Sequence, residues 1–188
     1  MIFKEKIGFT QFVANLIQFQ IDFIENNFDK LVDLADEYKV LSKNDKNELK
    51  SKIQVLAIAD ILYGCHQKLS GNISPQDINN CVAAVHKQYL TEYKNISEDI
   101  ATKQVVSVKS FLEYLGTQEY DNEEANKMNA HDKSLFYLCS SFAAYFAGTN
   151  IKSKNYEGKQ FAAFKLAKAI TKGDLVANSL KRYSIVNS

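Results

Sequence analysis

The chain has 188 residues, of which 46% are hydrophobic and 24% charged, and its formal net charge is +1. These values fit one folded domain with a substantial core, and they exclude a disordered chain. One proline and seven glycines are too few for a sheet protein with many hairpins. The first nine residues lack the apolar core of a signal peptide, and no apolar run is long enough to cross a bilayer. We therefore expect a cytoplasmic protein with no transmembrane segment.

The first predicted element, over residues 10–41, carries apolar side chains at alternating spacings of four and three. This spacing places them on one side of a helix and predicts one or two long amphipathic helices, with a bend at residues 25–29. The same seam is suited to pairing with a second copy or with a helix of another protein. The seam consists of Ile17, Ile21, Ile24, Phe28, Leu31, Ala35 and Tyr38.

The second predicted helix begins after Ser42, which is placed to cap it, and covers residues 45–69. Between Ile53 and Tyr63 it is apolar nearly all round. That pattern is typical of a central, buried helix with neighbours on several sides.

Residues 70–75 predict a turn between this helix and the next. Gly71 is placed to end the first helix in the left-handed conformation, Ser74 to cap the second, and Pro75 to occupy its first position. Ile73 and Ile78 occupy the two positions whose apolar side chains pack against each other across a helix start.

Further helices are expected over residues 75–94, 98–115, 130–147 and 159–171, and a short one from Asp174 to Tyr183, whose end from Ser179 is expected to fray. An acidic polar loop covers residues 117–129. The sequence thus predicts an all-α, single-domain bundle of six or seven helices over residues 1–188. The core positions expected on the third and fourth helices are Ile78, Val82, Val85, Tyr89, Ile100, Val108, Phe111, Leu112 and Leu115.

The three cysteines, Cys65, Cys81 and Cys139, lie among apolar neighbours and form no CxxC pair. We expect them to be reduced core thiols. His66 follows Cys65 directly, but adjacent residues of a helix diverge by about 100°, so the two do not form a catalytic pair.

Asp60 is the one charged residue in the apolar stretch of the second helix. Small neighbours on its face, among them Gly64, indicate a closely packed helix. An unpaired carboxylate at such a position is unfavourable, so Asp60 needs a partner or a raised pKa. Two interpretations stay open: a structural hydrogen bond, or an acid that lines a small-ligand pocket.

Three histidines limit the possible metal sites. The order His86, then His131 with Asp132, then Asp174 is similar to the H…HD…D pattern of the HD-domain metal-dependent phosphohydrolases, which are all-helical. The resemblance covers these four residues alone, and Asp132 and Asp174 also suit helix starts. It implies a metal-dependent phosphohydrolase as an alternative function. No phosphate-binding glycine loop, HExxH pair or repeated Glu-x-x-His is present, so we expect no metal and no cofactor.

The C-terminal segment, residues 151–188, is basic. It has a net charge of +6, from seven lysines and Arg182 against Glu157 and Asp174, while the rest of the chain is acidic. A predicted helix over 159–172 gathers a cationic stripe suited to a protein partner, an anionic membrane or a nucleic acid. The stripe consists of Lys159, Phe161, Lys165, Lys168 and Lys172.

These observations favour a non-catalytic helical binding module that engages a protein partner or associates with itself. The basic helix and the aromatic-rich helix over residues 130–147 are the expected binding elements. The alternatives are the phosphohydrolase-like set and an enzyme built around Asp60.

Overall fold

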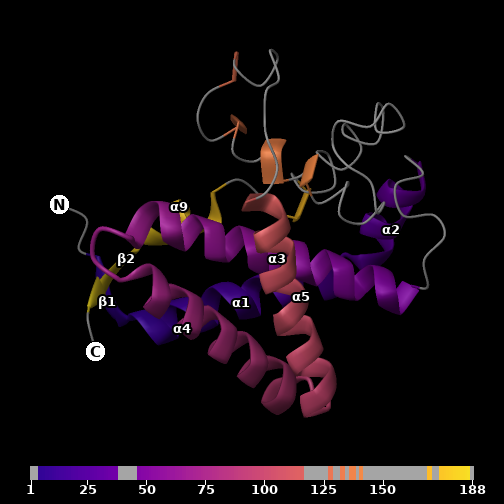
Figure 1. Cartoon of the computed structure of the whole chain (residues 1–188), viewed down its shortest axis with the longest axis horizontal. Coiled ribbons are helices and arrows are strands. Elements are labelled where there is room, and N and C mark those ends of the chain that lie inside the picture. Colours follow the sequence, from indigo (N-terminus) through magenta and orange to yellow (C-terminus); the bar gives the residue numbers. More distant parts are fainter. Residues whose placement is uncertain are drawn as a thin grey trace.

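The computed structural model describes residues 4–37, 46–116, 127–128, 132–133, 136–138, 140–141, 169–170 and 174–186. The fold is an all-α helical bundle with one small two-stranded sheet at its edge (Figure 1). The predicted fold class is therefore confirmed.

The first predicted element consists of two helices, α1 (Phe9–Asn26) and α2 (Phe28–Glu37). They meet at Asn27, whose side-chain Nδ2 donates a 2.9 Å hydrogen bond to the carbonyl oxygen of Phe23. The predicted bend is confirmed. The seam residues Ile17, Ile21, Ile24 and Leu31 are buried in the chain's own core, so this part of the seam is not available for pairing with a second copy.

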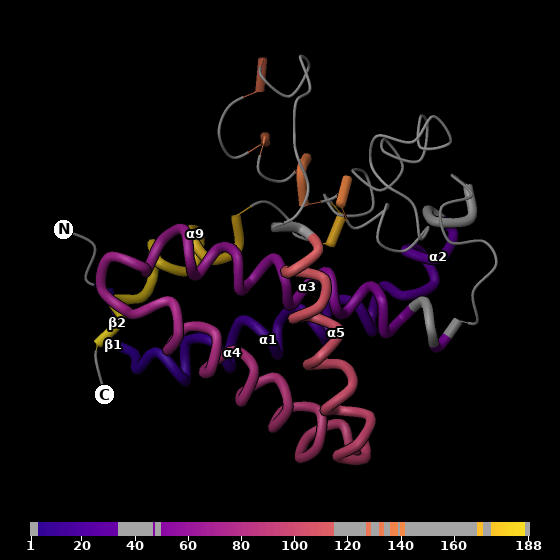
Figure 2. Tube along the Cα trace, in the orientation of Figure 1, coloured from indigo at the N-terminus to yellow at the C-terminus, as the bar shows by residue number. Residues whose placement is uncertain are grey.

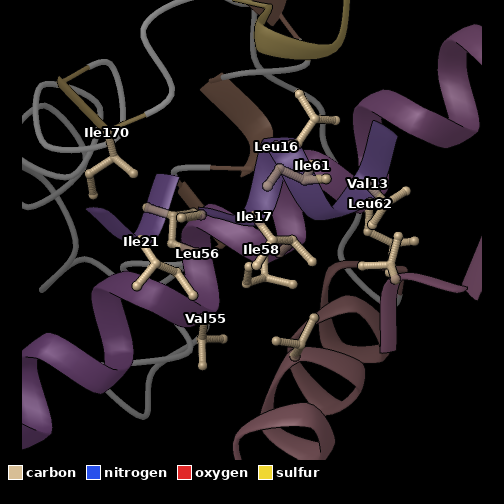
Figure 3. Packing of buried hydrophobic residues seen from close by; sticks show 14 of the residues in the cluster. Val13, Leu16, Ile17, Ile21, Val55, Leu56, Ile58, Ile61, Leu62 and Ile170 are labelled. Atoms are coloured by element: carbon tan, nitrogen blue, oxygen red, sulfur yellow. The ribbon is translucent and has the colours of Figure 1, made fainter. Parts of the chain in front are cut away.

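The central helix α3 (Lys46–Leu69) packs against α1, α4, α5 and a short helix, α9 (Leu175–Leu180). Its residues Ile53 to Leu62 are buried except Asp60, because neighbours cover it on several sides. Figure 3 shows part of this core, in which Ile17 and Ile21 of α1 lie beside Leu56 and Ile58 of α3. The predicted central buried helix is confirmed.

The turn after α3 is confirmed with one correction. The Ser74 hydroxyl oxygen accepts a 3.1 Å hydrogen bond from the backbone N–H of Asp77, and α4 (Pro75–Gln88) begins with the proline. Gly71, however, does not adopt the left-handed conformation. Instead, the carbonyl oxygen of Leu69 accepts bonds of 2.9 Å from the N–H groups of residues 72 and 73, which end α3 without a positive φ.

The last turn of the predicted third helix widens into a π-helical segment, η1 (Tyr89–Tyr93). The chain then turns at Asn95, whose φ is +51°, and enters α5 (Glu98–Gly116). Val108 and Phe111 are buried as expected, whereas Ile100 is 51% exposed. The expectation for Ile100 was wrong. In the first turn of α5, the buried residue is Ala101, and the neighbouring Ile100 therefore points away from the bundle.

A parallel strand pair joins two distant segments, β1 (Glu5–Gly8) and β2 (Tyr183–Val186). Glu5 lies opposite Tyr183 and Gly8 opposite Val186, and the two segments meet at one end of the molecule (Figure 2). The sequence predicted no strand here, and the expectation that residues from Ser179 fray was wrong. Neither strand sequence, EKIG nor YSIV, alternates strictly between polar and apolar residues, so the period-two signal of a strand is missing.

Within the residues described, no helix has the length and hydropathy needed to cross a membrane.

Candidate functional site

The Asp60 region lies where α9 meets α3. Gly64, one turn after Asp60, lets α9 approach closely: a Cβ atom added at Gly64 would lie 2.7 Å from the Cγ2 atom of Val176. Real carbon atoms do not approach so closely, so only glycine permits this contact. The close helix approach expected on the Asp60 face is confirmed.

Asp60 itself is partly buried and has no hydrogen bond or ion pair with any residue that the structure describes. Removal of its carboxyl group from water raises the pKa of Asp60 to about 8, and the negative charge of Asp174 adds to this effect. At neutral pH the folded chain therefore holds Asp60 mostly as the neutral acid, which can donate a proton in a hydrogen bond.

Asp174 has structural partners. Its Oδ1 atom accepts a 2.8 Å hydrogen bond from the backbone N–H of Ala177, which confirms the predicted helix cap. Its Oδ2 atom lies 3.4 Å from the Nζ atom of Lys68. Asp60, Gly64 and Lys68 are spaced four residues apart and so form one stripe of α3 that faces α9. The arrangement fastens α9 to the central helix.

Neither described histidine on α3 or α4 contributes to the pKa of Asp60. The Nε2 atom of His66 lies 2.8 Å from the Oδ1 atom of Asn79, which links the two helices on either side of the turn. Cys65 is fully buried, and its pKa is raised to about 12, first by burial and then by the charges of Cys81 and Asp60. Cys65 is thus the core thiol expected from the sequence. Cys81 is half-buried, and Cys139 lies outside the described residues.

The four residues of the HD-like pattern do not form a site within the residues that the structure describes. His86 is buried on α4, its Nε2 atom has no hydrogen-bond partner among the described residues, and burial alone lowers its pKa to about 4. Asp132 is half-buried, Asp174 caps α9, and His131 lies outside the described residues. Over the ranges described, no group of three or more His, Cys, Asp or Glu side chains is placed to hold a metal ion.

The predicted cationic stripe also lies outside the described residues, which include none of Lys159, Phe161, Lys165, Lys168 and Lys172. Two residues of that predicted helix are described, Ala169 and Ile170, and both are helical. Ile170 is fully buried and belongs to the core cluster. Residues 169–170 therefore pack against the helical bundle.

One polar cluster that the sequence did not reveal surrounds η1. The Tyr89 hydroxyl donates a 3.0 Å hydrogen bond to Asp22, and the Lys94 Nζ atom lies 2.7 Å from Glu25 and 3.3 Å from Asp22. The Glu25 hydrogen bond is the main cause of a raised pKa at Lys94. The ring of Tyr89 stacks on that of Tyr93, which is 70% exposed. This cluster fixes η1 to α1 and presents an aromatic ring to solvent.

A second unforeseen feature is a group of cations at the strand pair, which we call the cationic end: Lys4, Lys6, Lys181 and Arg182. All four are exposed, and Glu5 is the one acidic residue within residues 4–8 and 181–186. The Lys4 Nζ atom donates a 2.6 Å hydrogen bond to the carbonyl oxygen of Leu180, 176 residues away in sequence. No local pattern in the sequence could have brought these residues together.

The chain matches no protein-family model, no curated protein and no solved structure.

Proposed function

We propose that the chain is a non-catalytic helical binding module that engages an acidic protein partner through its basic C-terminal segment. The observation that carries this proposal is the cationic end, because it adds two N-terminal cations, Lys4 and Lys6, to Lys181 and Arg182 of the basic segment. Exposed charges of one sign attract an oppositely charged partner and accelerate its association.

The surroundings of the cationic end also suit binding. Lys6 lies on the strand pair and the other three cations directly precede its two strands, and the pair contacts α1 and α9. The predicted basic helix over 159–172 belongs to the same C-terminal segment and carries further cations. An acidic partner is favoured over an anionic membrane because the described cations lie beside polar Ser184 and a single exposed apolar side chain, Val186, and membrane-binding surfaces usually add a larger apolar face.

The test measures binding of a fluorescently labelled oligo-glutamate peptide by anisotropy, at low and at physiological salt. Replacing both Lys6 and Arg182 with Gln should weaken binding about three- to tenfold. The matched control replaces Lys30 and Lys103, two exposed lysines on α2 and α5, and should change the affinity little. A further variant with Gln at Lys159, Lys165, Lys168 and Lys172 tests the predicted basic helix.

The proposal fails if no acidic peptide binds at about 20 mM salt, where screening is weak. It also fails if the control pair weakens binding as much as the pair at the cationic end. Vesicles with anionic lipid and a polynucleotide are measured in parallel, and tighter binding to either would replace the acidic protein as the partner.

A small-ligand site around Asp60 is a second candidate, supported by the raised pKa of a carboxyl group that lacks a described partner. In a screen of small ligands by thermal shift, a hit that Asp60→Asn abolishes would favour this function. The phosphohydrolase-like set stays a prediction, since His131 lies outside the described residues. Phosphoesterase activity that is lost in His86→Gln and in Asp174→Asn would support it.

A further inference from the structure

The strand pair has two outer edges, and no described strand pairs with either of them. The backbone N–H of Glu5 donates a 3.0 Å hydrogen bond to the carbonyl oxygen of Arg182. In a parallel pair, alternate residues of each strand bond to the partner strand. Glu5 and Ile7 therefore point their backbone groups toward β2, whereas the N–H and C=O groups of Lys6 point away from it.

The outer edge of β1 thus offers a short ladder of backbone groups: the C=O of Lys4, the N–H and C=O of Lys6, and the N–H of Gly8. An edge of this kind is a template for another extended segment. Lys6 is the one side chain of β1 on the solvent face, which it shares with Ser184 and Val186, because Gly8 has no side chain. On the other face, Glu5 is exposed, while Ile7 and Ile185 are partly buried and pack against the core cluster.

The charges beside the β1 edge determine which kind of segment can pair with it. The β1 edges of two copies would bring like-charged lysines together, and such repulsion opposes edge-to-edge pairing. An acidic segment would instead place its carboxylates beside Lys4 and Lys6. On the opposite face its side chains would approach Ile7, so apolar residues fit there.

We propose that β1 binds an extended acidic peptide by strand addition, with acidic residues on the solvent face alternating with apolar residues on the core face. This inference rests on the proposed function and specifies the shape of the partner. The binding energy then has two sources: backbone hydrogen bonds to the β1 edge, and charge attraction to the cationic end.

The experiment separates these two sources with three versions of one probe, a short peptide of alternating Glu and Val. The first version is unmodified, the second carries N-methyl groups on its Glu amides, and the third on its Val amides. All three have the same charge, so they differ in which backbone donors remain. In an added strand one set of amides faces β1 and the other faces solvent.

Strand addition predicts that one methylated peptide loses about tenfold or more in affinity, because it loses donors to β1, while the other binds within about threefold of the unmodified probe. In the protein, Lys6→Pro should weaken binding of the unmodified probe more than Lys6→Gln, because the proline also removes the outward N–H group. Circular dichroism checks that both variants keep the helical fold.

Equal binding of both methylated peptides would overturn strand addition while leaving the proposed acidic partner intact. No binding of any of the three peptides at low salt would remove strand addition and the proposed function together. In that second case Lys4 and Lys6 serve to keep the β1 edge from pairing.

Discussion

Replacing Asp60 with Asn should stabilise the protein at alkaline pH and leave its stability nearly unchanged at acidic pH. The pKa of Asp60 is raised from 3.8 to about 8 in the folded chain, first by burial and then by Asp174. Between these two values the unfolded chain has lost the proton while the folded chain keeps it. The free energy of unfolding therefore falls as pH rises through this window, and the loss is complete above pH 8.

The size of this effect follows from the two pKa values. A difference between 3.8 and about 8 corresponds to at most roughly 5 to 6 kcal/mol, at about 1.4 kcal/mol per pH unit. Asp60 is only partly buried, and water near the carboxyl group reduces the penalty, so we expect about 2–4 kcal/mol at high pH. Asn has nearly the same shape as the neutral acid and carries no charge at any pH.

The assay is urea unfolding followed by helical circular dichroism, for the wild type and Asp60→Asn, at about pH 4 and about pH 9. The variant should gain about 2–4 kcal/mol over the wild type at the higher pH and less than about 1 kcal/mol at the lower pH. Asp33→Asn, which removes an exposed carboxylate from α2, is the matched control and should show no such dependence. The reasoning would be refuted by an equal difference between Asp60→Asn and the wild type at both pH values.

Three further outcomes are expected. Gly64→Ala should destabilise the fold by about 1–3 kcal/mol in urea unfolding, because the added methyl group meets Val176 at 2.7 Å. His86 should titrate near pH 4 in NMR spectra, and stability should fall as pH drops from 6.5 toward 4, because burial disfavours the charged ring. Tyr89→Phe should cost about 0.5–1.5 kcal/mol, since it removes the 3.0 Å hydrogen bond to Asp22.

Matched variants check each of these outcomes. Val176→Ala combined with Gly64→Ala should restore much of the loss, and simple additivity in this double-mutant cycle would contradict the contact. His86→Gln should remove much of the fall in stability between pH 6.5 and 4; an unchanged fall would assign it to other groups. Tyr93→Phe, at an exposed neighbour of Tyr89, should be nearly neutral, and an equal cost at both positions would argue against the Asp22 bond.

Local patterns in the sequence predicted the parts of the fold that local interactions determine. Ser74 and Pro75 define a helix start by their own chemistry, and Asp174 caps α9 for the same reason. The central position of α3 followed from its continuous apolar surface. The presence of a closely packed helix beside Asp60 also followed from local composition, because Gly64 left room for it.

The remaining features depend on contacts between distant residues, and no local pattern encodes them. The widening of the last turn into η1 is fixed by Tyr89 and Lys94 reaching Asp22 and Glu25, about seventy positions earlier in the chain. Ile100 fits an apolar helical pattern, yet it faces solvent because the packing of α5 places Ala101 inward. The proximity of Asp174 to Asp60 likewise could not be predicted, because neither segment alone indicates it.

The parallel direction of β1 and β2 also determines how the molecule resists mechanical tension. Tension applied before Glu5 and after Val186 acts at opposite ends of the four-residue pair, because these residues belong to different strands and opposite ends of the register. The strands would have to slide along one another, so all their hydrogen bonds are loaded at once rather than broken one by one. A chain stretched from its two sides should therefore yield first by shearing of this pair, and the helices behind it should extend only afterwards.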